Sequence, residues 1–159
     1  MEHPPPRSKR KAEPSLGARA LRLLARRDHT RPELAAKLAP HVEDATVLEA
    51  LLDEFTARGW LSETRVAEQV LHSKRGRLGP ARIRHALRQR GVSEGVVDAA
   101  VATLKGTELE AARTVWSRKF RQPGATRAER ARQVRFLQSR GFSLEVALRV
   151  VNRRGEDDR

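Results

Sequence analysis

The stretch Leu87-Arg-Gln-Arg90-Gly91-Val92-Ser93 decides the fold of this chain. It returns 50 positions later as Leu137-Gln-Ser-Arg140-Gly141-Phe142-Ser143, and a related stretch, Phe55-Thr-Ala-Arg58-Gly59-Trp60-Leu61-Ser62, stands earlier. Glycine can adopt the left-handed conformation that ends a helix, and the apolar residue after it folds back on that helix. Serine is a preferred first residue of the next helix. The pattern therefore predicts tight turns between short helices.

Helical spacing extends outward from these turns over the rest of the chain. Apolar residues recur every three to four positions from Leu16 onward, and no segment alternates with period two. Capping boxes and simple serine caps mark the starts of the predicted helices. They are the pairs Thr30/Glu33, Thr107/Glu110 and Thr126/Glu129, and the serines Ser62, Ser93 and Ser143. We therefore predict an all-α protein of about nine short helices.

The repeated turns divide the predicted helices into units. We expect three tandem, degenerate three-helix repeats over residues 16–60, 61–105 and 106–153, stacked into an elongated molecule. Each unit is too small to bury its apolar faces alone, so we expect neighbouring units to share a continuous core. Residues 1–15 combine prolines with basic residues and predict a disordered tail, and residues 154–159 predict a frayed end.

Composition indicates the class of partner. The 159 residues include 33 Lys and Arg against 20 Asp and Glu, which gives a formal net charge of +13. A chain this basic attracts polyanions, so nucleic acid or a nucleoprotein is the natural partner class. Cysteine is absent, and the five histidines lack the spacing of known zinc motifs. We expect no metal, no cofactor, no small-molecule substrate and no enzymatic activity.

Location follows from the same composition. No apolar run approaches the length of a membrane span, and the first 15 residues lack the apolar stretch of a signal peptide. We expect a cytoplasmic monomer that does not bind membranes.

Charge is unevenly distributed along the chain. No acid occurs between Glu68 and Glu94, and Glu129 is the single acid between Arg113 and Arg140, whereas residues 43–68 are rich in acids. This distribution predicts an acidic first third and two basic helices in the remainder. The candidate partner-binding or nucleic-acid-binding residues are the arginines of those two helices. They are Arg82, Arg84, Arg88, Arg90, Arg130, Arg132, Arg135 and Arg140.

Three motifs of the chain carry a resemblance to a known family. They are the turn Arg27-Asp28-His29-Thr30 before a Glu33-Leu34 helix, the stretch Gly79-Pro80-Ala-Arg82-Ile83 to Val92, and the stretch Arg135-Phe136-Leu137-Gln-Ser-Arg140-Gly141-Phe142. They resemble, in that order, the opening, middle and third motifs of the RecX family of RecA regulators. Ala86 stands where the middle motif often has an acid, and Val66 where an aromatic residue is usual. These two differences could weaken a partner contact.

The resemblance implies a non-enzymatic protein that binds the RecA filament on DNA. It further implies inhibition of recombinase, ATPase and co-protease activity, and so a role in DNA repair and the SOS response. The residues alone leave a second reading open. A basic helical protein could instead bind single- or double-stranded DNA, either independently of sequence or as a helix-turn-helix protein with a recognition helix at Thr30–Leu38 or Pro80–Arg90.

Overall fold

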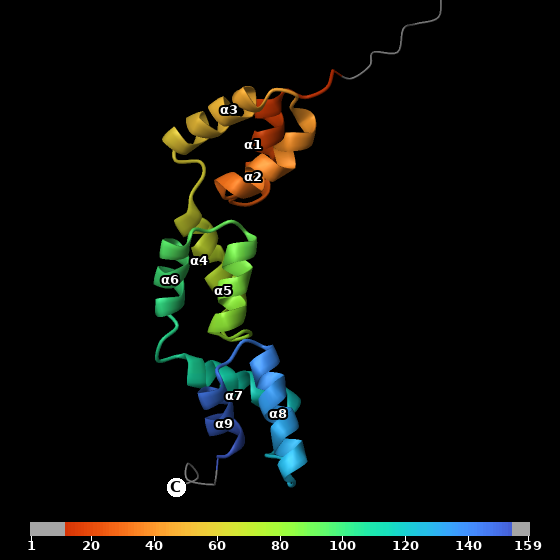
Figure 1. Ribbon diagram of the computed structural model, residues 1–159, viewed down its shortest axis with the longest axis vertical. Coiled ribbons are helices and arrows are strands. Elements are labelled where there is room, and N and C mark those ends of the chain that lie inside the picture. Colours follow the sequence, from red (N-terminus) through yellow and green to blue (C-terminus); the bar gives the residue numbers. More distant parts are fainter. Residues whose placement is uncertain (1–11, 154–159) are drawn as a thin grey trace, which may run out of the picture.

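The chain forms an elongated stack of three helical groups along one axis (Figure 1). The computed structural model describes residues 12–153, within which there are nine α-helices, one short 3-10 helix and no strand. We call α1–α3 repeat 1, α4–α6 repeat 2 and α7–α9 repeat 3. Their bounds are α1 Leu16–Arg26, α2 Arg31–Leu38, η1 Ala39–His41, α3 Ala45–Ala57, α4 Glu63–Lys74, α5 Pro80–Gln89, α6 Glu94–Ala102, α7 Glu108–Lys119, α8 Arg127–Ser139 and α9 Leu144–Val151.

The all-α prediction is confirmed. Of the predicted tail, residues 1–11 lie outside the described residues, as do residues 154–159 at the other end. Ser15, which we placed in the tail, instead begins the body of the protein: its hydroxyl accepts a hydrogen bond from the Ala18 amide at 3.1 Å and caps α1.

Two of the three predicted capping boxes are confirmed. Thr30 accepts from the Glu33 amide at 3.3 Å, and Glu33 accepts from the Thr30 amide at 3.1 Å. Thr126 and Glu129 exchange the same two bonds, both at 3.1 Å. Each box satisfies backbone N–H groups that have no partner within the helix, so α2 and α8 begin at fixed residues.

The third predicted box, at Thr107 and Glu110, is wrong. The Thr107 hydroxyl donates to the Leu104 carbonyl at 3.0 Å instead of accepting from the first turn of α7. The Glu110 carboxylate binds Arg113 at 2.6 Å. Both groups of the predicted box are therefore occupied by other local partners.

The serines at the helix starts take part in a contact that occurs within repeat 2 and again within repeat 3. Ser62 and Ser143 cap their helices as predicted. Ser93 does not, because its hydroxyl donates to the Glu63 carboxylate at 2.7 Å. Glu63 also accepts from the Ser93 amide at 3.2 Å, and Glu108 accepts from the Ser143 amide at 2.9 Å. In repeats 2 and 3 alike, a glutamate at the start of the first helix thus binds the start of the third.

The hydrophobic core is divided into three clusters, one in each repeat. Fully buried residues mark their centres: Leu52 in repeat 1, Ile83 and Leu87 in repeat 2, and Leu137 in repeat 3. The expectation of one core shared between units is therefore wrong. Each set of three helices buries its own apolar faces, which leaves the junctions between repeats to polar and backbone groups.

The glycine turns make those junctions. Gly91 and Gly141 have φ values of 76° and 93°, as the sequence predicted for the left-handed end of a helix. The hydroxyl of Thr30 donates to the carbonyl of Arg90, just before Gly91, and the amide of Gly79 donates to the carbonyl of Arg140, just before Gly141, at 2.7 Å. The end of α5 therefore meets the start of α2, and the end of α8 meets the start of α5. Opposite ends of the helix dipoles face each other at both contacts, which is favourable.

Candidate partner-binding surface

The two predicted basic residues in the middle of α5 are paired with acids. Arg84 binds Asp98 at 2.6 Å, and Arg88 binds Glu94 through two nitrogens at 2.6 and 2.9 Å. The hydrogen bond from Arg88 lowers the pKa of the Glu94 carboxyl below its usual value. The stretch between Glu68 and Glu94 contains no acid in the sequence. In the folded chain, however, Glu94 and Asp98 of α6 lie beside the arginines of α5.

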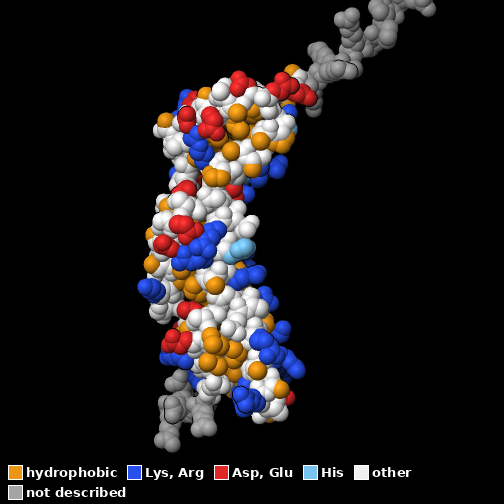
Figure 2. Space-filling view, viewed as in Figure 1, with side chains coloured by type: hydrophobic (Ala, Val, Ile, Leu, Met, Phe, Trp, Pro, Cys, Tyr) orange, Lys and Arg blue, Asp and Glu red, His pale blue; other side chains and the backbone are white. Residues whose placement is uncertain are grey.

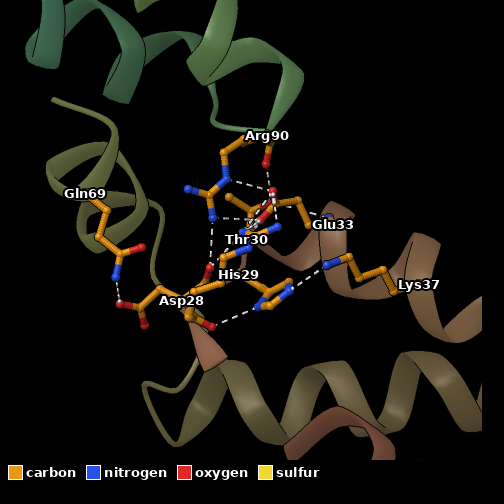
Figure 3. Close-up of polar contacts among 8 residues, drawn as sticks. Asp28, His29, Thr30, Glu33, Lys37, Gln69 and Arg90 are labelled. Carbon is orange, nitrogen blue, oxygen red and sulfur yellow. Dashed lines mark hydrogen bonds and ion pairs between the residues drawn. The ribbon is translucent and has the colours of Figure 1, made fainter. Parts of the chain in front are cut away.

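Arg90 belongs to the junction between repeats 1 and 2. Its guanidinium donates to the Glu33 carboxylate at 2.8 Å and to the Asp28 carbonyl at 2.8 Å (Figure 3). Burial opposes ionisation of Glu33, but hydrogen bonds from Arg90 and the Thr30 amide outweigh it and hold the pKa of that carboxyl below its usual value. Arg90 thus joins α5 to the start of α2, and its charge is neutralised there.

The turn between α1 and α2 supplies the rest of this junction, which sequence reasoning missed. Asp28 accepts from Gln69 of α4 at 2.9 Å, and the Nδ1 atom of buried His29 lies 2.9 Å from the Arg27 carbonyl (Figure 3). Lys37 lies 3.1 Å from the other ring nitrogen of His29. This arrangement fits a neutral ring that donates from Nδ1 and accepts at Nε2. The Arg-Asp-His-Thr motif was the signal in the sequence.

Two arginines of α8 remain available to a partner. Arg132 and Arg135 are exposed, and neither forms an ion pair with the acids of residues 12–153. Glu129 is the single acid of α8, and its carboxylate is occupied by the Thr126 and Ala125 amides. These amide bonds hold the pKa of Glu129 below its usual value.

The other α8 candidates have local contacts of different kinds. Arg130 is half-buried and donates to the carbonyls of Gly124 and Ala125 at 3.1 and 3.2 Å, so it braces the loop before α8. Arg140 is exposed, and its guanidinium lies 5.2 Å from the centre of the Phe136 ring. A cation over an aromatic face keeps its charge, so Arg140 stays available.

Arg82 joins this set from the start of α5. It is exposed, has no ion pair among the described residues, and lies against Gly141 at the junction of repeats 2 and 3. We define the basic surface as Arg82, Arg132, Arg135 and Arg140. Figure 2 shows Lys and Arg side chains along the side of the molecule formed by α8 and the adjoining end of α5. Four of the eight predicted arginines thus carry charge that no acid of residues 12–153 compensates through an ion pair.

Residues 12–153 contain neither a candidate metal site nor a helix that could span a membrane. No group of three or more His, Asp or Glu side chains there is placed to hold a metal ion. None of the helices in that range is long and apolar enough to cross a membrane.

Comparison with known proteins identifies the family. The model of the second three-helix domain of RecX matches residues 62–101, and that of the third three-helix domain matches residues 107–151. The regulatory protein RecX of Leptothrix cholodnii is 50% identical over 137 residues, which cover 86% of this chain and 87% of the relative. The chain belongs to the RecX family. RecX of Ralstonia nicotianae is 45% identical over 137 residues, 86% of each chain.

Solved RecX structures share the fold of this RecX-family chain. The crystal structure of RecX from Lactobacillus salivarius superposes with a TM-score of 0.74 at 16% sequence identity, over 86% of this chain and 92% of that one. The three-helix domain models correspond to α4–α6 and α7–α9. The relatives of Leptothrix cholodnii and Ralstonia nicotianae are both named regulatory proteins.

Proposed function

We propose that this RecX-family chain binds the RecA–DNA filament and slows its ATP hydrolysis, strand exchange and co-protease activity. It would act in the cytoplasm as a monomer, in DNA repair and the SOS response. The observation that supports the proposal is the basic surface of Arg82, Arg132, Arg135 and Arg140, whose charges have no acid partner among the described residues. Family membership supports the regulatory role.

The shape of the molecule supports a filament as partner. Three separately packed repeats joined end to end give a long surface, along which each repeat can reach a different part of an extended partner (Figure 1). Several weak contacts on one rigid molecule bind far more tightly than any one alone. A helical nucleoprotein offers a repeating partner surface of this kind.

We rank the proposed contact residues by whether an acid already pairs with them. Arg132 and Arg135 come first, with Arg82 and Arg140 beside them, because none of the four forms an ion pair among the described residues. Arg84 and Arg88 come second, because Glu94 and Asp98 already compensate their charge. Exposed ion pairs of this kind contribute only about 0–1 kcal/mol each, so a phosphate could displace the acid. The paired arginines nevertheless attract a distant polyanion more weakly than the unpaired arginines of the basic surface do.

Binding to bare DNA is the second candidate, since the basic surface attracts any polyanion. The structure argues against α2 or α5 as a recognition helix, because such helices contact bases through their first residues. Thr30, at the start of α2, is fully buried by repeat 2, and Gly79, at the start of α5, bonds to the Arg140 carbonyl. The DNA candidate is therefore a sequence-independent one, for single or double strands.

Co-sedimentation tests the proposal. The chain is mixed with RecA–DNA filaments or with the same DNA alone at matched salt, and the bound fraction is measured. We expect a clear preference for the filament, and we expect Arg132→Gln/Arg135→Gln to weaken it. Lys105→Gln/Arg149→Gln is the control, because it removes the same charge from exposed residues outside the proposed contact set and should leave the preference unchanged. Equal binding to filament and bare DNA would contradict the proposal and favour the second candidate.

A further inference from the structure

Repeat 1 contains a basic groove of its own, between α1 and the segment formed by α2 and η1. Its volume is about 380 Å³. Arg19, Arg22 and Arg26 of α1 form one wall, and Lys37 and His41 form the other. No acid lines it. The predicted acidic first third is therefore only partly right, because the α1–α2 side of that third is basic.

The charge of this groove is uncompensated. None of its three arginines, nor Lys37, forms an ion pair with an acid of residues 12–153. Arg31, which also lies on α2 but outside the groove, is held by both Glu49 and Asp53 at 2.7 Å. Glu49 and Asp53 of α3 thus neutralise Arg31 and leave the arginines of the groove without an acid partner. Four like charges around one depression repel one another, and an anion in the groove would relieve that repulsion.

The groove suits a linear anion. Arg19, Arg22 and Arg26 are spaced three and four residues apart, so they form a row about 10 Å long on one face of α1. Leu23 and Leu38 line the groove between its basic walls. A row of cations beside an apolar floor matches a chain of phosphates joined by sugars better than it matches a single small anion.

Lys37 is held in place on the opposite wall. Its ammonium lies 3.1 Å from Nε2 of His29, which is 1% exposed and is itself fixed by the Arg27 carbonyl. The buried ring therefore accepts a hydrogen bond from Lys37 without adding negative charge, so this contact adds no acid to the wall of the groove. The Arg27 carbonyl and His29, which lie at the junction of repeats 1 and 2, thus hold Lys37 in position beside the groove.

We propose that this groove binds the sugar-phosphate backbone of a nucleic-acid strand. The planar guanidinium of arginine can donate two parallel hydrogen bonds to one phosphate. The site is separate from the basic surface of repeats 2 and 3, and it would give the chain a second contact with DNA at the other end of the stack. It requires no particular base sequence, because all the named side chains would meet phosphate or sugar.

Fluorescence anisotropy of the full chain with labelled oligodeoxythymidine, without RecA, tests this site. Arg22→Gln/Arg26→Gln removes two exposed groove charges. Each lost phosphate contact lowers the dependence of log K on log salt by about 0.7 for a single strand, so we expect the slope to fall by about 1.4. Affinity at 0.1 M salt should fall on the order of 10-fold. The control, Lys105→Gln/Arg149→Gln, removes two exposed charges away from the groove and should change both values little.

The proposed site would be overturned by a groove variant that melts at the same temperature as the parent and binds oligodeoxythymidine with the affinity and salt dependence of the control. A variant that binds oligodeoxythymidine normally but loses binding of polyglutamate would also overturn it, in favour of an acidic protein ligand. If the double variant melts early, the single variant Arg22→Gln should still lose about 0.7 from the slope. RecA is absent from the assay, so its outcome is independent of the proposed filament binding.

Discussion

Replacing Gly141 with alanine should disrupt the junction between repeats 2 and 3. Gly141 has a φ of 93°, and a Cβ there would lie 2.6 Å from the backbone nitrogen of Arg82 and 2.5 Å from its Cγ. Backbone atoms cannot move aside as a flexible side chain does. To make room, α5 must move away from the end of α8, which breaks the bonds that Gly79 and Ala81 donate to the carbonyls of Arg140 and Gly141 at 2.7 and 3.1 Å.

The magnitude follows from two contributions. A positive φ costs a residue with a Cβ about 1 kcal/mol. Each lost backbone hydrogen bond costs about 1 kcal/mol more. Gly141→Ala should therefore destabilise the fold by about 3 kcal/mol, which lowers Tm by about 6–12 °C for a chain of this length.

Gly59→Ala is the matched control. Gly59 also ends a helix with a positive φ, of 70°, but a Cβ there meets no atom within 4 Å. Its expected cost is only the backbone contribution of about 1 kcal/mol, or about 2–4 °C in Tm. Both variants are compared with the parent by differential scanning calorimetry. Equal decreases in Tm for Gly59→Ala and Gly141→Ala would refute the close approach of α8 to α5.

Further predictions concern the junction of repeats 1 and 2. Thr30→Val removes the cap of α2 and the bond to the Arg90 carbonyl, so the free energy of unfolding in urea should fall by about 2 kcal/mol; a value near zero would contradict this role. Burial lowers the pKa of His29 below 6.5, so its contribution to stability is complete above that pH and is lost as the pH falls below it. The free energy of unfolding in urea should fall less between pH 7.5 and pH 5.5 in His29→Gln than in the parent. An equal fall in the two proteins would argue against a buried neutral ring.

Local features of the fold could be predicted from the sequence. The glycine turns and the boxes at Thr30 and Thr126 depend on residues within one helical turn of each other, so their spacing alone determines them. Thr107 was the exception, because its hydroxyl donates to the Leu104 carbonyl and the Glu110 carboxylate binds Arg113 instead. The division of the core into three clusters could not be predicted, because periodicity shows which face is apolar but not which helix covers it.

The site was harder to predict, because charge in space depends on which helices fold together. Glu94 and Asp98 lie several residues after the basic part of α5, and only the antiparallel return of α6 brings them onto Arg84 and Arg88. The reverse holds for Arg132, which stayed unpaired because α8 has one acid and that acid caps the helix. The repeat 1 groove was missed since its two walls come from different helices.

The ATPase rate of preformed RecA filaments tests the central claim most directly. The parent chain should slow ATP hydrolysis, and its effect should weaken steeply as salt rises, because the contact is electrostatic. Arg132→Glu/Arg135→Glu reverses two exposed, unpaired charges on α8 and should melt like the parent, since glutamate is a good helix former. We predict that this variant no longer slows the ATPase. A folded variant that inhibits at the same concentrations as the parent would contradict a mechanism based on the basic surface.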